Sequence, residues 1–175
     1  MQQHYYQKWA SPRVALASAL ALLICAPLAW ADEEASALAM PQVVSDTPFA
    51  SEREAVIWRR EELKDIESLV RQLRFDLINN QDIEAAMPRL LELQERASAQ
   101  RLLPAFIAGT HGSGSEARAS IWEEWEDFGA GFIDLEGKIA NLIEVAEQEN
   151  PRDTARALSE VGASCKSCHR TYRYD

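Results

Sequence analysis

The chain has 175 residues and a formal net charge of −10, with 47% hydrophobic and 26% charged residues. This length suits one ordinary domain with a full core plus an additional segment. Such an acidic body repels nucleic acid and anionic lipid, which excludes both as partners. Only 7 Gly and 7 Pro, together with abundant Ala, Leu and Glu, indicate helices joined by mostly short connections.

Residues 1–31 are typical of a cleaved export signal. Lys8 and Arg13 precede an apolar run from Val14 to Leu28, and the small-x-small cleavage pattern Ala29-Trp30-Ala31 follows. The run is somewhat short for a spanning helix, so an uncleaved anchor is the weaker alternative. We therefore expect a periplasmic protein that has no membrane association after cleavage near Ala31.

Cleavage removes two basic residues and no acid, which leaves 16 basic and 28 acidic residues and a mature charge of −12. The simpler interpretation of this charge is solubility. The functional interpretation is a basic partner, such as another redox protein.

Four amphipathic segments follow what we expect to be a flexible N-terminal tether over residues 32–50. We expect helices at about 52–79, 82–100, 117–149 and from Pro151 onward. Ser51 to Glu54 fits a capping box, and Asn150 before Pro151 is typical of a helix start. No strand pattern is visible. The sequence therefore predicts an all-α, up-down-up-down antiparallel four-helix bundle over residues 51–175.

The core-facing series is strongest in the third segment. Its apolar residues alternate spacings of four and three without a break: Ile121, Trp125, Phe128, Phe132, Leu135, Ile139, Leu142 and Ala146. The first segment has a similar series from Val56 to Leu77, on which Arg59 is the one charge. A charge at such a position must find a partner or stay at the rim.

The motif C-x-x-C-H occurs once, as Cys165-Lys166-Ser167-Cys168-His169. On a helix, positions i, i+3 and i+4 share a face. Two thiols one turn apart form thioethers with the two vinyl groups of a porphyrin, and the adjacent imidazole reaches the iron. The sequence therefore predicts one covalently attached haem c, held by Cys165 and Cys168 with His169 as the axial iron ligand.

Other roles for these three residues belong to a different class of protein. In a haem-free bundle, Cys165 and Cys168 would form a disulfide, which is common in an oxidising compartment. A zinc site would use both thiols, His169 and a fourth ligand such as His111.

Four stretches resemble the class II c-type cytochromes, the cytochrome c′ family. They are residues 161–173 (VGASCKSCHRTYR), 121–128 (IWEEWEDF), 105–110 (AFIAGT) and 54–60 (EAVIWRR). The resemblance covers about residues 50–174, nearly all of the mature chain, and it implies a four-helix bundle that carries haem c.

The resemblance also implies what faces the haem opposite His169. Family members with Met at the position of Leu63 are six-coordinate, whereas those with an apolar residue are five-coordinate. Leu has no lone pair for iron. The resemblance thus implies five-coordinate haem that binds NO or CO, transfers single electrons, or does both. No nucleophile–base–orienter set is visible, so we expect no enzyme activity.

Three further site residues come from the resemblance. It implies that Arg59 pairs with a haem propionate, that Tyr172 packs beside the haem, and that Arg173 lies near the proximal face. Family members often carry an aromatic residue in place of Leu103.

The alternative within the same fold is a six-coordinate, low-spin electron carrier. Its sixth ligand would be Met40, Met87 or His111, because no Met lies on the first helix. Many family members dimerise through their first two helices, so a homodimer is a further expectation. The sequence does not identify the redox partner.

Overall fold

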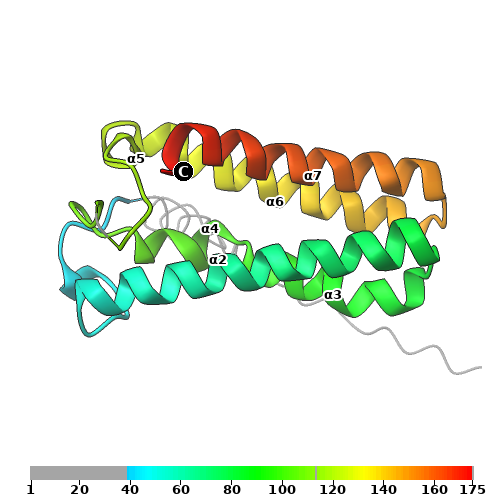
Figure 1. Ribbon diagram of the computed structural model, residues 1–175, viewed down its shortest axis with the longest axis horizontal. Helices are drawn as coiled ribbons and strands as arrows, with labels where there is room; N and C mark the ends of the chain where they lie inside the picture. The colour runs from blue at the N-terminus through cyan, green and yellow to red at the C-terminus, as the bar shows by residue number, and fades with distance from the viewer. Residues whose placement is uncertain (1–38, 113, 175) are drawn as a thin grey trace, which may run out of the picture.

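The computed structural model describes residues 39–112 and 114–174, and the expected export signal over residues 1–31 lies outside these ranges. Four long helices dominate: α2 (Glu52–Arg74), α3 (Ile83–Arg96), α6 (Trp125–Glu147) and α7 (Pro151–Tyr172). Figure 1 shows α6 and α7 side by side, with α2 and α3 as the other pair. The predicted all-α four-helix bundle is confirmed.

Short elements connect the long helices. They are the 3₁₀ turns η1 (Val44–Asp46) and η3 (Leu103–Ala105), the π-helical η2 (Phe75–Asn80), α4 (Ala99–Leu102) and α5 (Ser120–Glu123). The only β-type pairing within residues 39–112 and 114–174 is an isolated bridge between Ala117 and Arg173. In those same ranges, no helix has the length and apolar character needed to cross a bilayer.

Side-chain caps explain where two of the long helices begin. The hydroxyl of Ser51 accepts a hydrogen bond from the Glu54 N–H at 3.1 Å, as predicted. The Glu54 carboxylate accepts from Ala50 N–H rather than from Ser51, so the reciprocal half of the capping box is shifted by one residue. Asn150 accepts from two backbone N–H groups of the first turn of α7, and Pro151 occupies its first position, as predicted.

The third predicted helix, residues 117–149, is not continuous. Glu124 leaves the helical region with φ −119° and ψ 41°, which separates α5 from α6. The segment before α5 is tied to the end of α7, because Arg118 N–H donates to the Tyr172 carbonyl at 2.9 Å. The apolar series is nevertheless confirmed, since seven of its eight residues are buried and Leu135 is half-buried.

The second predicted helix, residues 82–100, is also interrupted. Helix α3 ends at Arg96, and α4 begins after Ser98. Side chains form hydrogen bonds with backbone groups that lack helical partners at the end of α3 and at the start of α4. The Ser98 hydroxyl donates to the Glu95 carbonyl at 3.0 Å, and the Glu136 carboxylate of α6 accepts from Ala99 N–H.

The described part of the predicted tether, residues 39–50, packs on the bundle. Met40 contacts the hydrophobic core. The Pro41 carbonyl accepts from Ala108 N–H at 2.8 Å, and Phe49 lies against Trp58 with ring centroids 5.4 Å apart. These contacts hold the described part of the segment against the bundle, while the flexibility of residues 32–50 as a whole stays a prediction.

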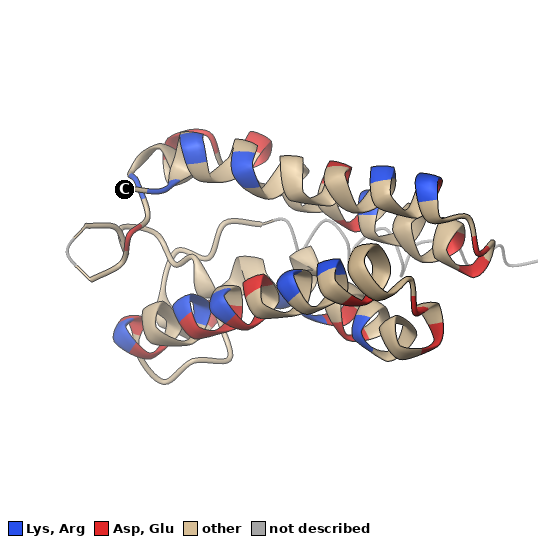
Figure 2. Cartoon of the chain, turned by 45° about the vertical axis from the view of Figure 1, so that its right-hand side comes forward, with Lys and Arg blue, Asp and Glu red and all other residues tan. Residues whose placement is uncertain are grey.

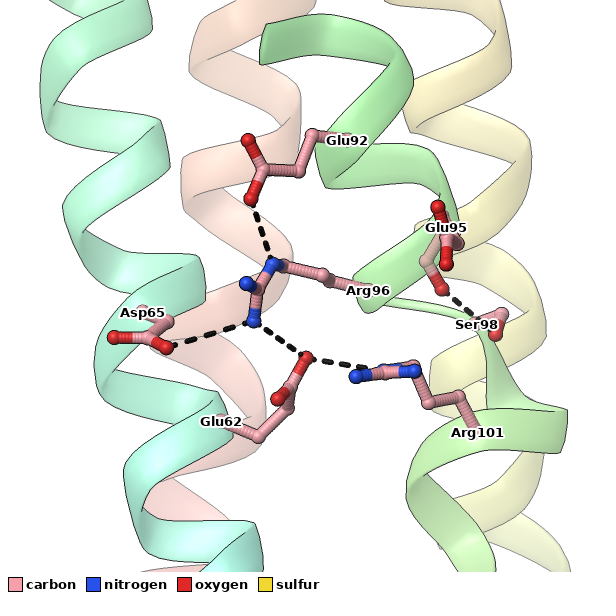
Figure 3. A network of polar contacts seen from close by, with 7 residues as sticks. All are labelled: Glu62, Asp65, Glu92, Glu95, Arg96, Ser98 and Arg101. Carbon is pink, nitrogen blue, oxygen red and sulfur yellow. Dashed lines mark hydrogen bonds and ion pairs between the residues drawn. The ribbon is translucent and has the colours of Figure 1, made fainter.

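A polar network fixes α2 against α3 and α4 (Figure 3). Glu62 of α2 is buried and accepts from Arg96 and Arg101, each at 3.0 Å. Arg96 also donates to Glu92 at 2.8 Å. A buried carboxylate with two cationic donors is well compensated, so the network holds the turn of α2 that carries Leu63.

Charged residues of both signs occur along the four long helices (Figure 2).

Candidate haem-binding site

A cavity of about 810 Å³ opens between α2, α6, α7 and the loop that follows α4. This volume lies in the range of about 300–1,000 Å³ typical of cofactor sites. Its walls are mainly apolar and aromatic, with Leu63 and Val70 from α2 and Phe106, Phe128 and Phe132 from the loop and α6.

The C-x-x-C-H motif lies on the last turns of α7 and lines this cavity. Cys165, Cys168 and His169 all border it, and both thiols are free. The predicted sharing of one helix face is therefore confirmed, whereas no disulfide joins the two cysteines. No three His, Cys, Asp or Glu side chains are grouped for a metal ion in residues 39–112 and 114–174.

The three side chains are uncharged in their folded surroundings. Burial raises the pKa of Cys165, and it raises the pKa of Cys168 to about 11. Burial and the nearby Arg173 charge lower the pKa of His169. Two thiols one helical turn apart and a neutral imidazole beside an apolar cavity of this size form the donor set that haem c requires.

The candidate sixth ligands lie elsewhere. Among the described residues, the lining of the cavity does not include Met40, Met87 or His111. Met40 and Met87 pack against the core, and His111 lies beside Trp122 with ring centroids 5.7 Å apart. Leu63, in contrast, is half-buried and borders the cavity.

Arg59 is the most buried charge in the described chain and has 1% of its surface exposed. One terminal nitrogen donates to the Ala105 carbonyl and the Thr110 hydroxyl, each at 2.8 Å. The other donates to the Thr110 carbonyl and the Ser115 hydroxyl, each at 2.5 Å. Burial lowers the pKa of Arg59 to about 10, so it remains a cation at neutral pH.

The four acceptors of Arg59 belong to one loop, residues 105–115, which supplies Phe106 to the cavity wall. The Arg59 guanidinium also lies over the Phe106 ring, 4.7 Å from its centroid. Arg59 thus fixes the loop against α2. Arg59 stands out in the sequence as the one charge in its apolar series, whereas Thr110 and Ser115 are polar loop residues with no signal to mark them as its partners.

The sequence model described as cytochrome C′ matches residues 54–173. The chain belongs to the cytochrome c′ family. Cytochrome c-556 of Agrobacterium tumefaciens (strain B2A) is 40% identical over 68 residues, which are 39% of this chain and 54% of that protein. Cytochrome c′ of Pararhodospirillum photometricum is 28% identical over 97 residues, which are 52% of this chain and 78% of that protein. The chain therefore spans about half the length of the first of these relatives.

The fold agrees with solved members of the cytochrome c′ family. Recombinant native cytochrome c′ of Alcaligenes xylosoxidans superposes with a TM-score of 0.64 at 26% identity, covering 73% of this chain and 99% of that one. Variants of that protein have been solved with bound carbon monoxide and with bound nitric oxide. The cofactor of the cytochrome c′ family is haem c, and the residues around the cavity of this member fit it.

Tyr172 and Arg173 end the haem-motif helix beside the cavity. The Tyr172 ring packs edge-on against Phe128 at 5.2 Å, and its hydroxyl donates to Glu124 at 3.1 Å. Burial and this carboxylate raise the pKa of Tyr172 to about 12. Arg173 borders the cavity, and its partner Glu116 was not anticipated from the sequence.

Glu116 joins two segments that border the cavity. Its carboxylate accepts from Arg60 of α2 at 2.8 Å and from Arg173 beyond α7 at 3.0 Å. Burial alone would raise the pKa of Glu116, but the bonds and charges of Arg60 and Arg173 hold it below its ordinary value. The backbone of Glu116 is left-handed, with φ +61°.

The substitution Glu116→Gln is expected to destabilise the fold by about 0.2–1 kcal/mol at neutral pH, because partly exposed ion pairs contribute little. The pKa of Glu116 is lower in the folded than in the unfolded state, so its contribution is present at neutral pH and disappears as pH falls through the folded value. Urea unfolding of the unmodified protein and of Glu116→Gln, at neutral and acidic pH, measures how their free energies of unfolding converge as pH falls.

The matched control is Glu67→Gln, which removes an exposed pair with Arg71 within α2 alone. It should change stability less than Glu116→Gln. A difference for Glu116→Gln that grows in acid would contradict the assignment of this carboxylate as the bridge.

Proposed function

We propose that this member of the cytochrome c′ family is a periplasmic monohaem protein whose five-coordinate haem binds NO or CO and transfers single electrons. In this proposal, Cys165 and Cys168 hold the haem covalently and His169 is the axial iron ligand. The observation that carries the proposal is one cavity bordered by all three motif residues and by Leu63.

The bound haem would supply a redox-active iron with one open coordination position. The residues of the chain determine what reaches that position. Leu63, Val70 and Phe106 border the cavity with apolar side chains and offer no ligand to the iron. Such a wall favours small, weakly polar molecules and disfavours water. Structures of variants of Alcaligenes xylosoxidans cytochrome c′ with bound carbon monoxide and with bound nitric oxide support this assignment.

Arg59 is the proposed partner of a haem propionate. It borders the cavity, and no carboxylate lies within ion-pair distance of it among the described residues. A buried cation without a counter-ion is costly, and a propionate would compensate it. Because its terminal nitrogens already bind the loop, we propose that Arg59 acts on the propionate as a charge while it holds the loop.

Further predictions complete the proposal. We place Arg173 near the proximal face and Tyr172 beside the haem. Neither residue forms a nucleophile–base pair, and the proposed role is binding and electron transfer rather than substrate turnover. Cleavage after about Ala31 stays a prediction, which mass spectrometry of the exported protein tests. A homodimer through the first two helices also stays a prediction, which sedimentation of that protein tests.

The deciding experiment is the visible spectrum of the mature protein when oxidised, when reduced, and when reduced under CO. We expect high-spin bands and a large change with CO. Sharp low-spin bands that CO does not alter would reveal a sixth ligand and contradict the role given to Leu63. An absence of haem absorbance after expression with haem-attachment machinery would support the haem-free alternative.

The variant Leu63→Met sharpens this test, because its thioether places a ligand on α2 at the cavity. It is expected to convert the spectrum to low-spin and to suppress the CO response. The control Leu69→Met introduces the same side chain at a buried position of α2 outside the cavity lining, and its spectrum should match that of the unmodified protein.

A further inference from the structure

We propose that the mouth of the cavity, which the exposed side chains of Lys64, Lys166 and Arg170 border, is a docking surface. Its partner is the acidic face of a protein that exchanges single electrons. This inference rests on the proposed function and adds the chemical nature of the partner. The mature charge of the chain suggested a basic partner, whereas the charges around the cavity favour the opposite sign.

Cations outnumber acids at the cavity. Its lining contains six cationic side chains and two acidic ones, a local charge of +4 on a chain whose net charge is −10. The cations are Arg59, Arg60, Lys64, Lys166, Arg170 and Arg173. A patch whose charge opposes the net charge of the protein attracts partners at short range, where the rest of the protein is screened by salt.

Both acids at the cavity are already neutralised by arginines. Glu67 pairs with Arg71 at 2.9 Å, and Glu116 pairs with Arg60 and Arg173. Neither carboxylate is therefore available to neutralise the remaining cations.

Three of the cations have no ion pair in the described structure. Lys64, Lys166 and Arg170 are exposed, and the ion pairs of the described residues include none of them. Lys166 and Arg170 are one turn apart on α7, and Lys64 lies on α2 at the same cavity. Figure 2 shows basic positions on both helices in the half of the bundle that carries the C terminus.

These charges surround the position at which an electron would enter or leave. Lys166 lies between the two motif cysteines, and Arg170 directly follows His169. Docking of an acidic face here would bring its redox centre close to the proposed haem. Complementary charge of this kind raises the association rate and fixes orientation, and a faster association at an unchanged dissociation rate tightens binding.

The test compares two triple variants of the haem-loaded mature protein. The mouth variant is Lys64→Gln, Lys166→Gln and Arg170→Gln. The control is Arg74→Gln, Arg152→Gln and Arg156→Gln, which removes the same charge at exposed residues outside the cavity lining. The probe is a flavodoxin, an acidic one-electron protein. Calorimetry of the two oxidised proteins at low ionic strength gives affinity without electron transfer.

We expect the mouth variant to bind the flavodoxin roughly tenfold or more weakly, and the control to stay within about twofold of the unmodified protein. Equal weakening by both variants, or no binding by the unmodified protein, would overturn the proposal. The visible spectrum of each variant reports haem loading, so a failure of the proposed function appears there and is distinguishable from a failure of docking.

A small anionic oxidant provides an independent readout. If the mouth governs approach, oxidation of the reduced protein by ferricyanide slows as ionic strength rises, despite the negative net charge. Faster oxidation at higher ionic strength would overturn the proposal, since it would mean that the negative net charge of the whole protein governs the approach of ferricyanide. Attraction of ferricyanide without flavodoxin binding would also overturn it, because the mouth would then attract small anions only.

Discussion

Replacement of both Cys165 and Cys168 by serine is expected to abolish covalent haem attachment. Serine is close to cysteine in size, but its hydroxyl does not form the thioether that the proposed attachment requires. Both thiols are free and border the cavity. Haem staining after denaturing electrophoresis, with intact mass, measures the loss. Each single substitution should leave at most one linkage, which persists on the gel at reduced intensity.

The control is Ser167→Ala, which changes an exposed residue between the cysteines and should leave attachment complete. The variant His169→Ala tests the iron ligand separately. We expect its spectrum to change in every state even where thioethers survive, because the axial nitrogen is absent. Full haem staining of the double serine variant would contradict the assignment of the motif.

Arg59→Met is expected to destabilise the fold by about 3 kcal/mol, the largest stability effect that we anticipate for one charged residue. Two contributions oppose each other. Removing a buried cation relieves its desolvation, but it also takes the donor from four oxygens of the Ala105–Ser115 loop. The loss dominates because these hydrogen bonds are charge-assisted and buried. Denaturant unfolding of the haem-free protein measures this loss of stability without any contribution from a propionate.

Arg71→Met serves as the matched control, because Arg71 makes one exposed pair within α2 and should cost less than about 0.5 kcal/mol. Thr110→Val and Ser115→Ala each remove one acceptor and should cost less than Arg59→Met. Equal stability of Arg59→Met and Arg71→Met would show that the loop does not depend on the guanidinium.

The sequence predicted the four long helices because their periodicity reports burial directly. The series from Ile121 to Ala146 is buried as its spacing indicates, and Asn150 caps α7 as its residue type indicates. It did not predict the break at Glu124 or the end of α3 at Arg96. Those boundaries depend on tertiary partners, such as the Tyr172 carbonyl and the Glu136 carboxylate, that periodicity does not reveal.

The site was predictable to the extent that one local motif encodes it. Cys165, Cys168 and His169 share a helix face by spacing alone, and the resemblance to a family added Leu63 and Arg59. The loop partners of Arg59 and the bridge through Glu116 join residues more than 40 positions apart. No short pattern records such contacts. The free cations at the cavity likewise become a group only when α2 and α7 meet.

The cavity unites the first and the last long helix of the bundle, with Leu63 on α2 and the cysteine motif on α7. A chain synthesised from its N terminus presents α2 early and Cys165 to His169 late, so the site closes only when the whole bundle sequence is available. A haem that is attached covalently to α7 and also contacts α2 would then link the first and the last long helix. Loss of the cofactor should accordingly loosen α2 and α7 together, whereas α3, which contributes no residue to the cavity lining, should be affected less.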